Sequence, residues 1–151
     1  MTAVNTEPNL SFRAAVTLLA AVGLPSSDLT EPQLEHFLFS GPRNAPTGLV
    51  GLELYDSVAL LRSLAVAPNA QRSGLGTTLL EQAEGYAYAH GVRSLYLLTT
   101  TAQRFFESRG YRLTSRESCP ASIRSTSEFV TLCPASSALL VKTWLRKRDL
   151  L

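Results

Sequence analysis

The clearest candidate for binding chemistry is the loop at residues 71–76, with the sequence Gln-Arg-Ser-Gly-Leu-Gly. It lies between an apolar run that ends at Val66 and an amphipathic segment that begins near Leu75. Successive backbone N–H groups at a helix N-terminus, together with the helix dipole, attract anions. Arg72 adds a full positive charge, and the glycines lack the Cβ atoms that would block a ligand. The loop therefore predicts a phosphate or pyrophosphate site. The alternative is a tight strand-to-helix turn that binds nothing.

This loop matches neither of the common nucleotide-binding motifs. It is not a Walker loop, because no Gly-Lys-Ser/Thr follows it. The dinucleotide fingerprint is also excluded, since there is a single G-x-G and no acidic residue ends the next strand. The glycine spacing alone is therefore a weak signal, and its context decides its meaning.

A second candidate site comes from the spacing of Glu53 and Arg62. Apolar runs at residues 48–55 and 58–66 are separated by Asp56-Ser57, which predicts a hairpin with a two-residue turn. Such a turn places Glu53 and Arg62 diagonally on one face of the hairpin, within reach of their long side chains. A single-residue change of register would separate them.

Two interpretations of this pair remain open. It can be a buried structural ion pair, because an arginine in the middle of a strand needs a partner. Alternatively, Arg62 binds a substrate carboxylate while Glu53 takes up a proton from a substrate amine, directly or through water. In a regular strand Ser63 lies on the face opposite Arg62.

Hydrophobic periodicity predicts the elements that must position these side chains. The segment 74–91 is a helix with Leu75, Leu79, Ala83, Tyr86 and His90 on one stripe, ended by Gly91. The other predicted elements are a helix over 11–22, a short helix capped by Asp28 or Thr30, strands over 36–40, 94–100, 111–117 and 137–145, and a short helix over 101–110 with Phe105 and Phe106 inward.

The order of these elements predicts a mixed α/β sheet with helices on both faces. The strand at 60–66, the helix and the strand at 94–99 form a right-handed βαβ unit. Its first loop, 71–76, follows the C-terminal end of a strand, where open α/β sheets bind ligands.

Length and composition predict one domain over residues 1–151, with 1–9 as a flexible leader. The 45% apolar and 17% charged residues are typical of a soluble globular protein. A net charge of +2 provides no broad basic face for nucleic acid. The apolar segment 14–25 is too short to span a membrane, and the polar first residues are unlike a signal peptide. We therefore expect a cytoplasmic protein without a nucleic-acid or membrane partner.

Two ordered segments resemble a known family. "LAVAPNAQRSGLGTTLL" (64–80) resembles the acetyl-CoA-binding motif of the GNAT superfamily of N-acetyltransferases, and "LYLLTTTAQRFFESRGYRL" (95–113) resembles the strand, helix and strand that follow it. The resemblance covers roughly residues 49–145. Within the superfamily, "LLRSLAV", "LYLLTTTAQRFFESRGY" and "IRSTSEFVTLCPASSALLVK" look like the arsenic-resistance N-acetyltransferase subgroup.

The resemblance implies a mostly antiparallel central sheet with a splayed-strand site for acetyl-CoA, the acetyl donor. It implies that Leu64, Ala65 and Val66 pair with the pantetheine arm and direct an N–H, assigned to Leu64, at the thioester oxygen. It also implies that Phe105 contacts the cofactor. By the same resemblance, the pyrophosphate is held by Gln71, Arg72, Ser73, Gly74, Leu75, Gly76 and Thr77.

Other residues are candidates for the acceptor side of such a site. Thr99, Thr100 and Thr101 end a strand beside the implied thioester; the alternative is strand-end capping. The segment 120–134 is a candidate lid or acceptor wall, with Arg124, Ser125 and Glu128 as its polar residues. Many family members protonate the leaving thiolate with a tyrosine, but Phe106 stands at that position here. Water, or no dedicated acid, then serves instead.

The two cysteines, Cys119 and Cys133, raise the question of metalloid binding because of the subgroup. Two thiolates can bind trivalent arsenic, but their spacing is wide and the sequence shows no third ligand. We therefore predict small packed residues, with thiols kept reduced, and no metal site.

These observations predict an acetyl-CoA-dependent N-acetyltransferase. The resemblance to the subgroup implies a small amine or amino-acid-like acceptor, including an arsenic- or phosphorus-bearing glutamate analogue, that attacks the thioester directly. One alternative is a catalytically silent CoA-binding sensor or partner protein. Another is a nucleotide-phosphate module, which would bind ATP as tightly as CoA. A homodimer is a family-level expectation.

Overall fold

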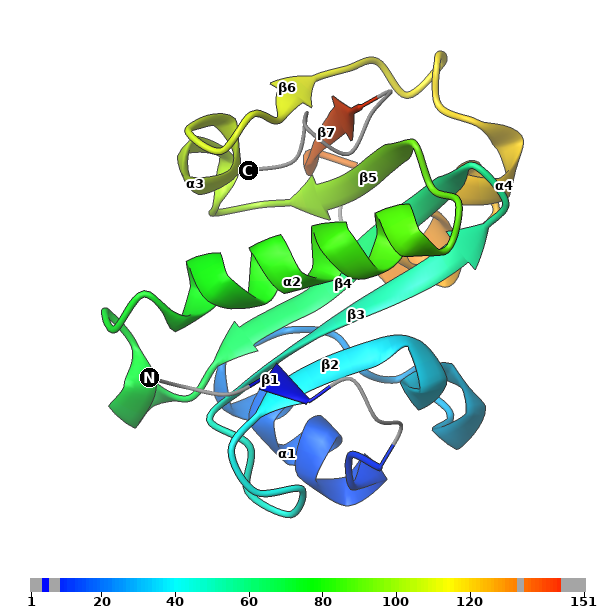
Figure 1. The fold of residues 1–151 in the computed structure, drawn as a ribbon. Helices are drawn as coiled ribbons and strands as arrows, with labels where there is room; N and C mark the ends of the chain where they lie inside the picture. The colour runs from blue at the N-terminus through cyan, green and yellow to red at the C-terminus, as the bar shows by residue number, and fades with distance from the viewer. Residues whose placement is uncertain (1–3, 6–8, 133–134, 145–151) are drawn as a thin grey trace. The chain divides into compact units, whose positions relative to one another are not determined.

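A two-residue turn joins the two longest strands, β3 (Gly48–Tyr55) and β4 (Val58–Val66), and confirms the predicted hairpin (Figure 1). Asp56 in this turn has φ +59°, a conformation that aspartate tolerates better than most residues. The structure is a computed structural model that describes residues 4–5, 9–132 and 135–144. Its contacts divide the chain into a first unit, residues 1–53 and 61–86, and a second, residues 54–60 and 87–151.

The strands of the first unit follow the order β1 (Val4–Asn5), β2 (Phe37–Ser40), β3, β4. The β1–β2 and β2–β3 pairs are antiparallel, and Phe37 pairs with Gly51. The strand at Val4–Asn5 shows that the predicted flexible leader is wrong for these two residues. Backbone pairing with β2 orders them.

Two helices connect these strands. α1 (Phe12–Ala21) begins where Ser11 Oγ accepts a hydrogen bond from the N–H of Ala14 at 3.2 Å, and it is followed by Gly23 with φ +76°. The predicted second helix is a 3₁₀ helix, η1 (Glu31–His36), and Thr30 precedes it. The core of the unit consists of Leu10, Ala15, Leu18, Leu19, Leu29, Leu34, Phe37, Phe39, Leu49 and Ala65.

The helix predicted over 74–91 is α2 (Leu75–Ala89), and it is followed by Gly91 with φ +90°. Its buried face is wider than the predicted stripe, because Leu80, Glu84 and Ala87 are buried beside Leu75, Leu79 and Ala83. Tyr86 is half-buried, and His90 is exposed beyond the helix end. The last position of the predicted stripe is therefore wrong.

In the second unit the order is β4, β5 (Ser94–Thr99), β7 (Ala138–Thr143), β6 (Arg112–Leu113). Val58–Leu60 of β4 pairs in parallel with Ser94–Tyr96 of β5, whereas β7 is antiparallel to both its neighbours. These strand pairs form a mixed, mostly antiparallel sheet, as predicted. The strand predicted over 111–117 is only two residues long, and Leu145 of the last predicted strand lies outside the described residues.

The second unit also contains α3 (Gln103–Glu107), α4 (Ala121–Arg124) and a π-helical turn, η3 (Glu128–Leu132). Leu60, Cys119, Ile123 and Leu139 form its buried cluster, against which Tyr55, Val58, Tyr96, Leu98 and Phe129 pack. No helix in the described ranges is long and apolar enough to cross a membrane.

Gly51 provides a test of the packing in the first unit. A Cβ built at this residue would lie 2.3 Å from Cζ of Phe37, a ring that is 1% exposed. We expect Gly51→Ala to lower the free energy of unfolding by about 1–3 kcal/mol, because the ring must shift within a packed core. Urea denaturation of the purified variant measures this loss.

Gly85 is the matched control, since it lies in α2 and a Cβ built there meets no atom within 4 Å. Gly85→Ala should leave stability unchanged or raise it by up to about 1 kcal/mol, because alanine favours helix. Equal losses in both variants would contradict the close-packing explanation.

Candidate functional site

The predicted anion loop precedes α2 and follows a short 3₁₀ turn, η2 (Pro68–Ala70). Arg72 and Gly74 have φ +64° and +84°, and residues 71–74 are exposed. Backbone in such left-handed and turn conformations directs successive N–H groups to one side and forms concave anion sites. A Cβ built at Gly74 meets no atom within 4 Å, so the space beside this residue is open to a ligand.

Hydrogen bonds within the loop hold its shape. Ser73 Oγ donates to the carbonyl of Ala70 at 2.6 Å, and Gln71 Nε2 donates to the carbonyl of Val66 at 3.1 Å. The first helical bond runs from the N–H of Thr78 to the carbonyl of Gly74 at 3.1 Å. The N–H groups at the start of an α-helix point out of the helix, toward the loop that precedes it. The backbone here is therefore arranged as in the anion sites described above, and the phosphate site stays a prediction.

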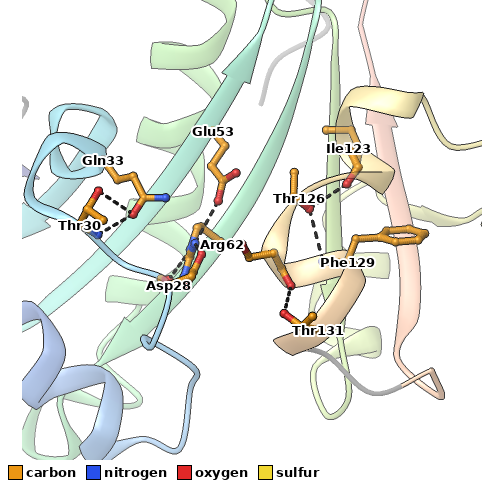
Figure 2. A network of polar contacts seen from close by, with 11 residues as sticks. Asp28, Thr30, Gln33, Glu53, Arg62, Ile123, Thr126, Phe129 and Thr131 are labelled. Atoms are coloured by element: carbon orange, nitrogen blue, oxygen red, sulfur yellow. Dashed lines mark hydrogen bonds and ion pairs between the residues drawn. The ribbon is translucent and has the colours of Figure 1, made fainter.

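Arg62 is the centre of a charged cluster in the first unit. Its Nη1 donates to Asp28 Oδ2 at 2.5 Å and to Glu53 Oε2 at 3.0 Å, and its Nη2 donates to Asp28 Oδ1 at 2.8 Å (Figure 2). The Arg62 side chain is 1% exposed, whereas Asp28 and Glu53 are 12% and 14% exposed. The two carboxylates therefore lie between the guanidinium and solvent.

This geometry confirms that Glu53 and Arg62 share a face, and it favours the structural interpretation of their contact. Asp28 occupies the planar fork of Arg62 with both of its oxygens, the arrangement that a substrate carboxylate would adopt. The sequence predicts Asp28 only as a possible helix cap and gives no sign of this contact. The loop at residues 22–30 brings it to Arg62 from 34 positions away, and no local pattern indicates such a contact.

Ser63 corrects a second prediction. Arg62 Nε donates to Ser63 Oγ at 3.1 Å, so the two side chains are in contact and do not lie on opposite faces. Ser63 has φ +61°, which interrupts the regular alternation of side chains along β4.

The electrostatics of the cluster are visible in Asp28. Burial disfavours its charged form, but the hydrogen bonds and charge of Arg62, with a backbone hydrogen bond, outweigh burial and lower the pKa of Asp28. Asp28 is therefore ionised at neutral pH, and its negative charge balances the positive charge of Arg62.

The remaining predicted residues of the first unit lie along β4 and at the start of α2. Leu64 and Val66 are half-buried and Ala65 is buried. Gly76 and Thr77 are half-buried, whereas Leu75 packs into the interior with 4% of its surface exposed. Leu75 can therefore offer only its backbone to a ligand.

Predicted residues of the second unit lie at the end of β5 and in α3. Thr99 Oγ1 accepts the N–H of Ala102 at 2.9 Å, which is the capping alternative, while Thr100 and Thr101 are exposed. Phe105 is half-buried beneath the guanidinium of Arg109, whose Cζ lies 3.8 Å from the ring centroid.

Phe106 is a core residue. It is 5% exposed and lies edge-on to Phe105 and Tyr111, with ring centroids 5.1 and 5.6 Å apart. The position of the Phe106 ring is thus fixed by aromatic packing.

Part of the segment that the sequence predicts as an acceptor wall is buried. Arg124 and Ser125 are exposed, but Thr126 and Glu128 are buried. Thr126 Oγ1 donates to the carbonyl of Ile123 at 2.7 Å and accepts the N–H of Phe129 at 3.3 Å (Figure 2). Glu128 therefore does not line an exposed wall.

Cys119 is buried, and burial raises the pKa of its thiol despite the opposing charges of Arg124 and Arg116. Cys133 lies outside the described residues. Within the described ranges, no group of three or more His, Cys, Asp or Glu side chains could hold a metal ion.

Comparison with known proteins establishes the family. A profile of the Acetyltransferase (GNAT) family matches residues 19–111, which is more than half of the chain. The protein therefore belongs to the GNAT family of acetyltransferases, as the two ordered motifs predict. Membership of the arsenic-resistance subgroup stays a prediction.

Its curated relatives include amino-acid acetyltransferases. The enzyme of Pseudomonas fluorescens is 41% identical over 61 residues, which is 40% of this chain and 14% of that protein. The enzyme of Pseudomonas syringae pv. tomato is 36% identical over 69 residues, 46% of this chain and 16% of that protein. The matches therefore span only a small part of these longer relatives.

Solved structures show the fold. N-acetylglutamate synthase from Neisseria gonorrhoeae, complexed with coenzyme A and N-acetyl-glutamate, has a TM-score of 0.81 at 21% identity and covers 97% of this chain and 36% of that chain. A Mycobacterium tuberculosis protein in complex with CoA has a TM-score of 0.73 at 14% identity, over 95% and 99% of the two chains. The chain has the mixed α/β fold of GNAT proteins.

The lowered pKa of Asp28 gives a testable pH dependence. Its ordinary value is 3.8, so the stabilisation from the ionised carboxylate is fully present above that pH and disappears as the pH falls through the lower, folded-state pKa. At pH 7, Asp28→Asn should cost about 1–3 kcal/mol, because Arg62 loses a charged partner. Urea denaturation from pH 7 to pH 3 should show the difference from wild type shrinking only below the ordinary pKa.

Asp56→Asn is the control, because Asp56 is exposed in the hairpin turn and asparagine also tolerates its positive φ. A pH-independent difference between Asp28→Asn and wild type would contradict the assigned ion pair.

Proposed function

We propose that this protein is an acetyl-CoA-dependent N-acetyltransferase that acetylates the amine of a small amino-acid-like acceptor. The observation that carries the proposal is the open, glycine-containing loop at the start of α2 in a chain of the GNAT family. Names of the relatives support the acceptor class, since they are amino-acid acetyltransferases and an N-acetylglutamate synthase. Arsenic- and phosphorus-bearing glutamate analogues are narrower candidates within that class.

The donor would be held by backbone groups of the first unit. N–H groups of Arg72 to Thr77 would bind the pyrophosphate, with Arg72 adding charge. Leu64 to Val66 would pair with the pantetheine arm, and the N–H assigned to Leu64 would stabilise negative charge on the thioester oxygen. Bound acetyl-CoA supplies the activated acetyl group. Phe105 is the proposed side-chain contact to it.

The acceptor amine must lose a proton to become a nucleophile. Glu53 is the proposed base, acting directly or through water, and its hydrogen bond to Arg62 fixes its direction. Thr99, Thr100, Thr101 and Arg124 are proposed acceptor contacts from the second unit. Because Phe106 has no hydroxyl, water would protonate the thiolate.

The loop proposal is tested by Gly74→Asp, compared with Gly74→Asn. Both side chains tolerate the positive φ of Gly74 and face the same open space, so they differ only in charge. We expect CoA affinity in Gly74→Asp to fall at least tenfold below that of Gly74→Asn, because a carboxylate repels the pyrophosphate. Isothermal titration calorimetry measures both values. Equal CoA affinity in the two variants would show that the pyrophosphate does not bind beside Gly74.

Glu53→Gln tests the base. The amide oxygen can still accept a hydrogen bond from Arg62, so the cluster is retained while the proton acceptor is lost. Thiol release from acetyl-CoA, measured over a panel of amino acids and their phosphinic and arsinic analogues, should fall about 100-fold or more in kcat. CoA affinity should stay unchanged. If kcat were unchanged with the acceptor that wild type uses, Glu53 would not be the base.

A CoA-binding sensor without catalysis is the second candidate, and the buried Phe106 in place of tyrosine favours it. The sensor binds CoA and releases no thiol with any acceptor of the panel. A nucleotide-phosphate module differs from both, because it binds ATP as tightly as CoA.

A further inference from the structure

Asp28 occupies the position on Arg62 that an acceptor carboxylate would take. We propose that Asp28 is a displaceable internal carboxylate that sets the specificity of the acceptor site; this inference rests on the proposed acetyl transfer. An α-amino acid would exchange its carboxylate for that of Asp28 on Arg62. Acceptors without a carboxylate have no group to exchange.

The first argument is the cost of a buried cation. The side chain of Arg62 is 1% exposed, and a buried charge that loses its partner strongly destabilises the folded state. An arginine that binds substrate at this depth therefore needs an anion in the absence of substrate. Exchange of one carboxylate for another keeps Arg62 paired before and after binding.

Access gives the second argument. The guanidinium itself is covered, while the two carboxylates that contact it keep 12% and 14% of their side-chain surface exposed. A solute carboxylate that replaced one of them would reach the fork of Arg62. Glu53 belongs to strand β3, whereas Asp28 belongs to the loop at residues 22–30 between α1 and η1. Asp28 is the partner whose backbone can move with less loss of structure.

The chemistry of an α-amino acid fits the exchange. Asp28 binds Arg62 through both oxygens, at 2.5 and 2.8 Å, which is the bidentate geometry of arginine with any carboxylate. In an α-amino acid the amine lies on the carbon next to the carboxylate. A carboxylate in the place of Asp28 therefore brings that amine close to Glu53, which already contacts the same Nη1 at 3.0 Å.

Binding without turnover provides the first test. Asp28→Ala should be stabilised by sodium acetate, which fills the vacated place on Arg62, and not by acetamide, which has the same shape without the charge. Wild type and the exposed control Asp56→Ala should show no such difference. The shift in Tm between acetate and acetamide is the readout. An equal acetate effect in all three proteins, or no effect in a folded Asp28→Ala, would overturn the proposal.

Acceptor selectivity provides the second test, with the milder variant Asp28→Asn in case Asp28→Ala does not fold. Asparagine keeps the shape but competes more weakly for Arg62. The ratio of kcat/KM for L-glutamate to that for 4-aminobutanamide, which has the amine but no carboxylate, should rise about tenfold over wild type. An unchanged ratio would overturn the proposal.

The two tests separate this inference from the proposed function. If acetate alone stabilised Asp28→Ala and no acceptor caused thiol release, the displaceable carboxylate would be supported and the acetyltransferase activity would be contradicted. If L-glutamate caused thiol release, but acetate gave no stabilisation and the ratio of kcat/KM values did not change, the acetyltransferase activity would be supported and the displaceable carboxylate would be contradicted.

Discussion

The buried guanidinium of Arg62 constrains the first unit more than any other single group. A charge that is this deeply covered must be paired, and its partners include residues from separate parts of the chain. Glu53 is in the preceding strand, Ser63 is the next residue, and Asp28 is in a loop 34 positions away. The loop at residues 22–30 has little regular structure of its own. Pairing with Arg62, together with burial of Leu29, therefore determines where it lies.

Positive φ angles at non-glycine residues mark the parts of the first unit that are proposed to bind ligands. Ser63 and Arg72 have this conformation, and one lies beside Arg62 while the other lies in the loop before α2. Such backbone costs of order 1–3 kcal/mol and persists only when neighbouring interactions hold it. At Ser63 the hydrogen bond with Arg62 does so, and around Arg72 the bonds of Gln71 and Ser73 hold the loop. Strain at both places is consistent with backbone that is shaped for a ligand.

Sequence patterns predict those parts of the fold that depend on local signals. α1, β2, the β3–β4 hairpin and α2 follow from periodicity, a two-residue turn and glycines at helix ends, and all four are present. The sequence predicts a longer β6, because "YRLTSRE" alternates like a strand along its whole length. Only Arg112 and Leu113 of this segment pair with β7. The position of Asp28 and the conformation of Ser63 could not be predicted. Each depends on Arg62 and on tertiary contacts, and a serine carries no signal for positive φ.

The replacement of tyrosine by Phe106 is consistent with the chemistry that the proposed site must perform. An α-amino group has a reference pKa of about 8 and is mostly protonated near neutral pH, so it must lose a proton before it attacks, whereas a thiolate can leave before water protonates it. Removal of the amine proton is thus the more demanding step, and the group proposed for it, Glu53, is held by Arg62. A hydroxyl at Phe106 would instead need a partner among the aromatic rings of Phe105 and Tyr111. In the proposed mechanism, a site with an oriented base and no dedicated acid therefore lacks the less valuable of the two groups.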